Sequence, residues 1–287
     1  MTSNGLKNMQ EANVMAGRRS SWTRRGGLAA CLAVVGLMLA GVPALAQDRT
    51  IKVGIMSGED EEVWQAVVAE AAKTGLTVEP VVFSDYTQPN EALARGDIDA
   101  NAFQHQPYLD AQIQSQGYEI TAVGYTAVWP IGLYSRKYKS VAELPEGATI
   151  GVPNDPSNEG RALLVLQNEG LIRLDPEAGI LATVTDIVEN PKDLRINELD
   201  AGVVGRAIDD LDAAVVNTDW ALKAGLDPDQ ERIAQEPIEN NPYRNFIAVR
   251  TEDKDAPWVA PLVAAYQNEA VRAVFDRVYR GTGVAAY

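Results

Sequence analysis

Alternating strand-like and helix-like segments constrain the fold of this chain more than any other feature. Residues 50–56 (TIKVGIM) form a short β-rich run, and four acidic residues at 59–62 then open a segment with apolar residues at helical spacing, which Gly75 ends. Acidic residues in the first turn and a glycine after the last turn are typical of a helix. The alternation continues as strand, short helix and strand over residues 77–83, 90–95 and 98–103. This rhythm favours a mainly parallel sheet covered by helices.

The same alternation starts again after two strand-like segments at residues 118–128 and 131–135. It predicts strands at 149–152, 181–186 and 213–217, helices at 157–169 and 203–209, and a short extended or helical piece at 193–198. A last strand at 245–250 precedes a helical tail at 257–280, which we expect to pack on the first part of the chain.

We therefore predict an α/β fold of two lobes joined by two crossovers. Lobe 1 would comprise residues 47–135 and 240–287, and lobe 2 would comprise residues 136–239. A cleft between two such lobes is a common place for a small ligand.

The first 46 residues have the pattern of a secretory signal peptide. Four arginines between positions 18 and 25 precede an apolar run at 28–42, and the small-residue site Ala44-Leu45-Ala46 follows it. The run is too short and too near that site to be a good membrane span. We expect cleavage after Ala46 and a mature protein in the periplasm.

Cys31 is the only cysteine of the chain, and its context Leu28-Ala29-Ala30-Cys31 resembles the lipid-attachment site of a bacterial lipoprotein. That site closes the hydrophobic region of a signal peptide, whereas here the hydrophobic region follows Cys31. We therefore expect no lipid anchor at Cys31. The mature chain then contains no thiol, which excludes a disulfide and a cysteine nucleophile.

Charge and residue types exclude several classes of function. Without residues 1–46 the chain keeps 20 basic and 39 acidic residues, a net charge of −19, and such a surface disfavours nucleic acid. His105 is the only histidine, and no GxSxG, Walker A, CxxC or HExxH motif occurs. We therefore predict no metal, no cofactor, and no hydrolase or zinc chemistry.

Residues 152–167 (VPNDPSNEGRALLVLQ) run from an apolar strand through a polar turn into a helix that carries Arg161 in its first turn. Ser157 or Asn158 would cap this helix, and the N–H groups of its first turn have no partner within the helix. Free N–H groups beside a fixed cation suit a small carboxylate. The alternative is a solvated arginine on a surface helix.

Further candidates lie where predicted strands run into loops. Phe103, His105 and Tyr108 would form an aromatic wall at the end of the strand at 98–103, where open α/β sheets bind ligands. Similar junctions hold Tyr86, Asn217 and Asn245. The alternatives are core aromatic residues with a hydrogen-bonded histidine, and asparagines that serve ordinary turns.

Five segments in the same order resemble the NlpA family of substrate-binding lipoproteins. They are IKVGI (51–55), GDIDANAFQHQPYLD (96–110), VGYTAVWPIGLYS (123–135), PNDPSNEGRALLVLQ (153–167) and NPYRNFIAVR (241–250). The resemblance covers essentially the whole mature chain. The best-known members of the family are methionine-binding proteins of ABC importers. The resemblance therefore implies a periplasmic-binding-protein fold, similar to type 2, with methionine enclosed between two lobes.

The resemblance also implies roles for single residues. Arg161 would pair with the carboxylate of the ligand, because the fork of an arginine fits a carboxylate. The asparagines that would hydrogen-bond its amino and carboxylate groups are Asn154, Asn217 and Asn245. The residues that would enclose its thioether are Tyr86, Phe103, His105 and Tyr108, and sulfur packs favourably on such rings.

The resulting hypothesis is a non-enzymatic, monomeric binding component that delivers methionine to an ABC permease and its ATPase. We expect the L isomer as ligand and leave the D isomer open. Members of the family are lipid-anchored through a cysteine at the cleavage site, whereas this chain has Ala46-Gln47 there, so we expect a soluble periplasmic protein. The alternative ligands are another amino acid, a methionine-containing dipeptide or a sulfur compound. The alternative from a different class is a periplasmic enzyme that uses carboxylates of the cleft.

Overall fold

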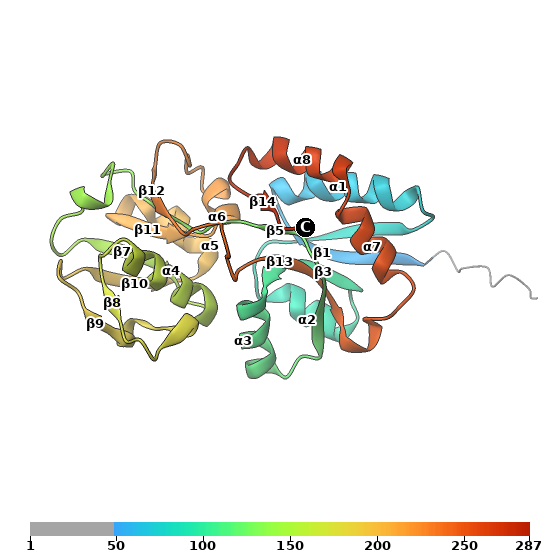
Figure 1. Cartoon of the computed structure of the whole chain (residues 1–287), viewed down its shortest axis with the longest axis horizontal. Helices are drawn as coiled ribbons and strands as arrows, with labels where there is room; N and C mark the ends of the chain where they lie inside the picture. The colour runs from blue at the N-terminus through green and yellow to red at the C-terminus, as the bar shows by residue number, and fades with distance from the viewer. Residues whose placement is uncertain (1–48) are drawn as a thin grey trace, which may run out of the picture. The chain divides into compact units, whose positions relative to one another are not determined.

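The computed structural model describes residues 49–287, and these all belong to one compact unit. The predicted signal peptide, Cys31 and the cleavage site after Ala46 lie outside the described residues. Figure 1 shows the strands gathered into two separate groups, each with its own helices. None of the helices in the described part has both the length and the apolar character needed to cross a bilayer.

The first sheet has five strands in the order β2-β1-β3-β13-β4. β1 pairs in parallel with β2 and β3, whereas β13 runs antiparallel to β3 and β4. The strands are β1 (Thr50–Met56), β2 (Thr77–Phe83), β3 (Ala100–His105), β4 (Ile120–Tyr125) and β13 (Asn245–Arg250). The helices of this lobe are α1 (Glu59–Ala72), α2 (Gln88–Arg95), α3 (Gln106–Gln116), α7 (Val259–Tyr266) and α8 (Glu269–Tyr279).

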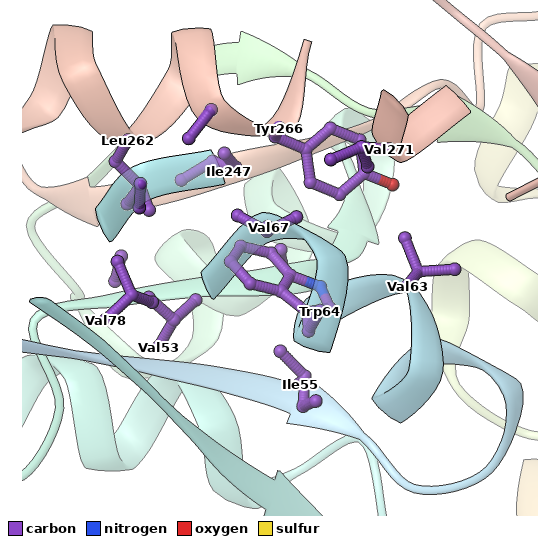
Figure 2. Close-up of a cluster of buried hydrophobic side chains, with 14 of the residues drawn as sticks. Val53, Ile55, Val63, Trp64, Val67, Val78, Ile247, Leu262, Tyr266 and Val271 are labelled. Atoms are coloured by element: carbon purple, nitrogen blue, oxygen red, sulfur yellow. The ribbon is translucent and has the colours of Figure 1, made fainter. Parts of the chain in front are cut away.

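The core of this lobe lies between the sheet and the helices α1, α7 and α8. Trp64 and Val67 of α1 are fully buried beside Val53 and Ile55 of β1 (Figure 2). The Trp64 ring also packs on Tyr266 of α7, with 5.5 Å between the ring centroids. Fully burying one large apolar side chain contributes about 1.5–3 kcal/mol, so this cluster stabilises the lobe strongly. The tail of the chain therefore packs back on the first lobe, as predicted.

The second sheet has the strand order β10-β7-β11-β6-β12. β7 is parallel to β10 and β11, and β6 is antiparallel to β11 and β12. Its strands are β6 (Gly132–Tyr134), β7 (Thr149–Pro153), β10 (Arg195–Leu199), β11 (Ala213–Val216) and β12 (Arg232–Gln235). Its helices are α4 (Pro156–Asn168), α5 (Ala201–Val204) and α6 (Thr218–Lys223), and a two-stranded ladder joins β8 (Arg173–Leu174) and β9 (Ile187–Glu189). Short 3₁₀ turns are η1 (Val141–Glu143), η2 (Gly179–Leu181), η3 (Val184–Asp186), η4 (Gly205–Asp210) and, in the first lobe, η5 (Thr251–Asp253).

Two crossovers join the sheets. The chain leaves the first lobe after β5 (Ala127–Val128), which pairs with β14 (Val284–Ala285), and returns between β12 and β13. The predicted α/β fold with two lobes and two crossovers is thus confirmed. β6, which we placed in lobe 1, pairs with β11 and β12, so the second sheet already begins at residue 132.

Several elements differ from the sequence prediction. The strand expected at 181–186 is wrong: η2 and η3 occupy this stretch, because Thr183 and Asp186 form a capping box that closes a tight turn. The tail is divided into α7 and α8, because the Asn268 side chain caps α8. The elements that we did not predict include α3, which begins directly at the end of β3, and β12.

Candidate functional site

A cavity lies where the ends of both sheets and the crossovers meet. It is bordered by the ends of β1, β3, β11 and β13, the first turns of α1, α3, α4 and α6, a loop after β2, the first crossover and α8. The residues that line it are Met56, Ser57, Glu59, Asp60, Tyr86, Ala102, Phe103, Gln104, His105, Tyr108, Trp129, Asn158, Arg161, Asn217, Thr218, Asp219, Asn245 and Tyr279. Both lobes therefore contribute side chains to one site.

Three aromatic rings form an apolar wall on the side of the first lobe. Phe103 of β3, Tyr108 of α3 and Tyr86 of the loop after β2 lie with their ring centroids 5.7–6.1 Å apart. The Tyr108 hydroxyl donates to the Tyr86 carbonyl at 2.8 Å and so holds that loop against the helix. Tilted and edge-on rings at these distances attract one another, so the wall is a fixed surface.

His105 joins this wall to the second lobe. It caps α3, because its Nδ1 accepts the N–H of Tyr108 at 3.2 Å. Its Nε2 therefore carries the proton and faces Asn158 Oδ1 of α4 at 3.3 Å. Burial, together with the charge of Arg161, lowers the pKa of His105 to about 3. His105 is a neutral donor at neutral pH.

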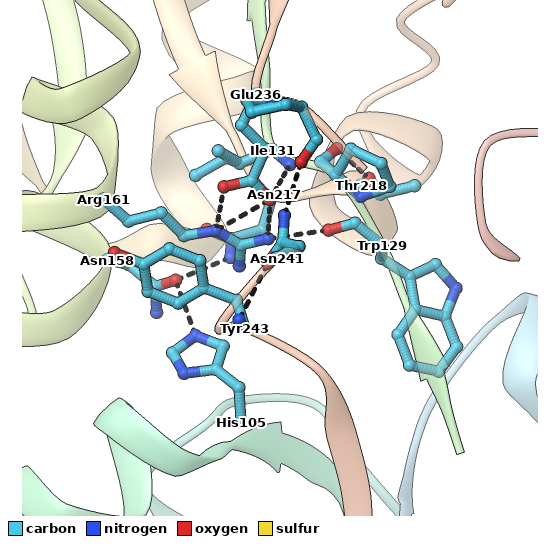
Figure 3. A network of polar contacts seen from close by, with 12 residues as sticks. His105, Trp129, Ile131, Asn158, Arg161, Asn217, Thr218, Glu236, Asn241 and Tyr243 are labelled. Carbon is cyan, nitrogen blue, oxygen red and sulfur yellow. Dashed lines mark hydrogen bonds and ion pairs between the residues drawn. The ribbon is translucent and has the colours of Figure 1, made fainter. Parts of the chain in front are cut away.

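Arg161 is not the solvated arginine of the alternative reading. It is 3% exposed, its Nε donates to both carboxylate oxygens of Glu236 at 3.1 and 2.9 Å, and its Nη2 donates to Glu236 and to the Trp129 carbonyl (Figure 3). The ring of Tyr243 lies 4.4 Å from the guanidinium carbon. The fork of Arg161 thus holds Glu236, whereas its Nη1 makes no hydrogen bond with any described residue.

Two asparagines stand beside this arginine. Asp155, and not Ser157 or Asn158 as predicted, caps α4, because Asp155 precedes the first helical residue and accepts the Asn158 N–H at 3.0 Å. The Asn158 side chain also donates to Asp155, and its Oδ1 accepts the Asn217 Nδ2 at 2.9 Å. Asn217 is 8% exposed and its Oδ1 has no partner among the described residues, which leaves a buried acceptor at the cavity.

The cavity also has an acidic part, formed by Asp60 of α1 and Asp219 of α6. Asp219 Oδ1 accepts the Tyr86 hydroxyl at 2.5 Å, and Lys223 lies 3.7 Å from its other oxygen. Burial, with the Asp219 charge as the second cause, raises the pKa of Asp60 to about 8. Burial also raises the pKa of Asp219, while Lys223 opposes this shift.

The structure brings together seven of the eight residues proposed from the sequence. The cavity lining includes Tyr86, Phe103, His105, Tyr108, Arg161, Asn217 and Asn245. Asn154 is exposed in the turn before α4 and is not part of the lining. Asn158, which lies one helical turn further along, occupies the cavity instead.

Sequence reasoning missed four important residues of the site. Trp129 lies inside the segment 123–135 that carried the resemblance, but nothing in that segment marks it as a lining residue. Asp60 and Asp219 are acidic residues in the first turn of a helix, where they need no other explanation. Glu236 gave no signal at all, because its partner Arg161 is 75 residues away in the chain.

Within residues 49–287 no group of three or more His, Cys, Asp or Glu side chains is placed to hold a metal ion. The residues that line the cavity supply hydrogen-bonding groups, one arginine, carboxylates and aromatic rings. These groups suit the recognition of a small molecule that carries both charged and apolar parts.

Two α/β lobes, two crossovers and a lined cavity where they meet define a two-lobed binding protein for small ligands. The model of the family described as NlpA lipoprotein matches residues 51–287. The chain belongs to this family.

Individual relatives are similar over nearly their whole length. D-methionine-binding lipoprotein MetQ of Escherichia coli (strain K12) is 45% identical over 280 residues, which cover 95% of this chain and 100% of that protein. A solved structure of a nutrient-binding protein from Burkholderia cenocepacia bound to methionine is 53% identical, with a TM-score of 0.80, and covers 83% of this chain and 100% of its own. An ABC transporter periplasmic substrate-binding protein from Coxiella burnetii is 43% identical, with a TM-score of 0.79, over 82% of this chain and 100% of its own.

Proposed function

We propose that this protein is the substrate-binding component of an ABC importer and that its ligand is methionine. The observation that carries the proposal is a single cavity in which an aromatic wall faces a buried arginine with a free Nη1. The names of the relatives support it, since the Escherichia coli protein is named for D-methionine binding and the Burkholderia cenocepacia structure holds methionine.

In this proposal each part of methionine has a partner. The thioether packs on Tyr86, Phe103 and Tyr108, because sulfur gains about 0.3–1.5 kcal/mol on an aromatic ring. The carboxylate accepts from Arg161 Nη1, and the ammonium donates to Asn217 Oδ1. Asn158 and Asn245 supply further polar contacts, and Asn154, which is exposed, has no part in binding.

Thermal unfolding with a panel of amino acids tests this function. A ligand at about 100 times its dissociation constant stabilises the folded state by about 2.7 kcal/mol, and for a domain of this size each kcal/mol raises the midpoint by about 2–4 °C. The protein is first stripped of carried-over ligand by partial unfolding and dialysis. A rise of about 5–10 °C with L- or D-methionine supports the proposal. If neither isomer raises the midpoint, methionine is not the ligand. If another amino acid, a methionine-containing dipeptide or a sulfur compound raises it instead, that compound is the ligand.

Asp60 and Asp219 are the observation that favours the alternative class, a periplasmic enzyme that uses cavity carboxylates. A carboxyl group kept protonated near neutral pH can act as a general acid. We propose nonetheless that the protein does not catalyse a reaction. The test is to incubate the protein with each ligand that it binds and to recover that ligand unchanged by mass spectrometry.

We further propose that the mature protein is a periplasmic monomer that starts at Gln47 and carries no lipid on Cys31. The Coxiella burnetii relative is described as periplasmic, whereas the Escherichia coli relative is named a lipoprotein, so the two properties need separate tests. Mass spectrometry of the exported chain would detect a different N-terminus or an attached lipid. Sedimentation analysis would detect an oligomer.

A further inference from the structure

Glu236 binds Arg161, which lines the cavity, but Glu236 is not itself part of the lining. Its carboxylate accepts from Arg161 Nε and Nη2, and both side chains are buried, with 5% of Glu236 and 3% of Arg161 exposed. Figure 3 shows the pair at the centre of a polar network, with Tyr243 next to the guanidinium. Because the fork edge of Arg161 is taken by Glu236, a ligand meets only the remaining edge, which carries Nη1.

Glu236 also ties the two crossovers to each other. Its backbone N–H donates to the Ile131 carbonyl at 3.1 Å, and its Oε1 accepts the Ile131 N–H at 3.1 Å. Ile131 belongs to the first crossover and Glu236 to the second. Arg161 donates to the Trp129 carbonyl of the first crossover as well, at 2.9 Å. The orientation of the guanidinium is therefore fixed on three sides before any ligand arrives.

The pairing also sets the charge at the arginine end of the cavity, away from the acidic part formed by Asp60 and Asp219. Arg161 and Glu236 together carry no net charge, and His105 on the other side of Asn158 is neutral. A buried carboxylate without a matching cation would therefore add one uncompensated charge to the site, which is costly. An ammonium on the same ligand removes this cost, and the unpartnered Asn217 Oδ1 is a buried acceptor for it.

We propose that Glu236 is the residue that makes the cavity select zwitterions over anions, because it neutralises and positions Arg161. The proposal rests on the proposed function, since it assumes that a ligand carboxylate meets Arg161. Glu236 acts through Arg161 and is a positioning and specificity-determining residue that does not itself touch the ligand.

The test compares two ligands that differ only in the ammonium: L-methionine and 4-(methylthio)butanoate, which keeps the thioether and the carboxylate. Their dissociation constants are measured by titration calorimetry for the wild-type protein and for Glu236→Gln. The wild type should prefer the zwitterion. In Glu236→Gln the charge of Arg161 is no longer neutralised, so the ratio of the two dissociation constants should move toward the anion by about tenfold or more.

Two further variants separate the effect of the lost charge at Glu236 from the effect of a lower stability of the fold. Glu236→Asp keeps the charge and should retain the wild-type preference, even if its thermal midpoint falls as far as that of Glu236→Gln. Glu189→Gln breaks an exposed pair with Arg173, in which 61% and 53% of the side chains are accessible, and should leave the ratio unchanged. A Glu236→Gln ratio equal to that of the wild type would overturn the inference alone. If the wild type binds neither compound, the proposed function and this inference both fall.

Discussion

At the scale of single residues, the buried pair of Arg161 and Glu236 makes the strongest prediction about stability. Arg161→Ala leaves the Glu236 carboxylate buried with only the Ile131 N–H as a partner. Removing one member of a buried ion pair typically costs about 3–5 kcal/mol of unfolding free energy. The variant should therefore unfold at lower urea concentration without ligand, and it should also lose the shift caused by ligand.

Two controls accompany this variant. Arg136→Ala breaks pairs with Glu231 and Asp209 near the surface and should cost less than about 1 kcal/mol. The double variant Arg161→Ala, Glu236→Ala removes both charges and should recover part of the lost stability, while ligand binding stays absent. Equal stability of Arg161→Ala and the wild type would mean that Glu236 becomes hydrated when it is alone.

Asp60 predicts an unusual dependence of stability on pH. Burial raises its pKa from 3.8 to about 8, so the folded state keeps a proton that the unfolded chain releases. The contribution of this proton is complete below about pH 4 and is lost as the pH rises to about 8, with a slope of up to about 1.4 kcal/mol per pH unit. Asp60→Asn is neutral at every pH and should be more stable than the wild type at pH 8, by an amount that shrinks toward pH 5.

Urea unfolding of both proteins between pH 5 and 8 measures this difference. The lowered pKa of His105 acts in the opposite sense, because stability is lost as the pH falls below 6.5 and the unfolded histidine gains a proton. This loss is common to both proteins, so the difference between them isolates Asp60. If the unfolding free energies of the wild type and Asp60→Asn change with pH in parallel, Asp60 is ionised in the folded state.

Residue types at strand ends could predict most of the cavity from the sequence, since parallel strands present their carboxyl ends to one side. They could not predict what each side chain does there. The fork of Arg161 was assigned to a ligand, yet it holds Glu236, and no local pattern reports a partner in a distant crossover. The sequence favoured Asn154 as a ligand residue and Asn158 as a helix cap, and only the helix that begins between them decides which one faces the cavity.

At the scale of elements, the first turn of α4 links helix stability to the site. Asp155 accepts the Asn158 N–H and both of its oxygens accept the Asn158 side chain, which in turn accepts from Asn217. Asp155→Ala should lower the unfolding free energy by about 0.5–2 kcal/mol, as for other lost helix caps. Because Asn158 is then free to turn, the affinity for the ligand, measured by titration calorimetry, should fall as well.

Asn268→Ala is the matched control for this prediction. Asn268 caps α8 by accepting the Ala270 N–H at 2.8 Å, outside the cavity. The Asn268→Ala variant should lose a similar amount of stability and keep the wild-type affinity for the ligand. Unchanged affinity in Asp155→Ala would mean that Asn158 is held by Asn217 and His105 alone.

Elements were predictable where a chain segment determines its own structure. The strand at 50–56 and the helix that ends before Gly75 were confirmed, because alternation, acidic first turns and glycine stops are local signals. The stretch 181–186 was not, since its apolar residues suggested a strand while a capping box closed it into 3₁₀ turns. Close packing adds a further constraint there: a Cβ on Gly160 of α4 would lie 2.3 Å from the Ile180 carbonyl oxygen, so only glycine lets this segment approach the helix.

At the scale of the whole molecule, the two lobes meet through few polar contacts, and most of them line the cavity. His105 of the first lobe faces Asn158 of the second, and the hydroxyl of Tyr86 donates to Asp219. A ligand that occupies the cavity thus touches the same side chains that join the lobes. Binding and the relative position of the lobes should therefore be coupled, which is what a transporter needs in order to distinguish loaded from empty protein.

Tyr86→Phe tests this coupling with a minimal change. The ring stays in the aromatic wall, but Asp219 Oδ1 loses the donor that lies 2.5 Å away across the lobes. An unsatisfied buried acceptor costs about 1–3 kcal/mol, and water can satisfy it only when the lobes separate. The variant should therefore bind ligand about 5–150-fold more weakly, while its ligand-free midpoint stays near that of the wild type.

Calorimetry gives the affinity, and small-angle scattering with saturating ligand should show a larger radius of gyration than the wild type. Tyr118→Phe, at a half-buried position in the same lobe and outside the cavity, should change neither quantity. If Tyr86→Phe binds as tightly as the wild type, the bond between Tyr86 and Asp219 does not contribute to closure.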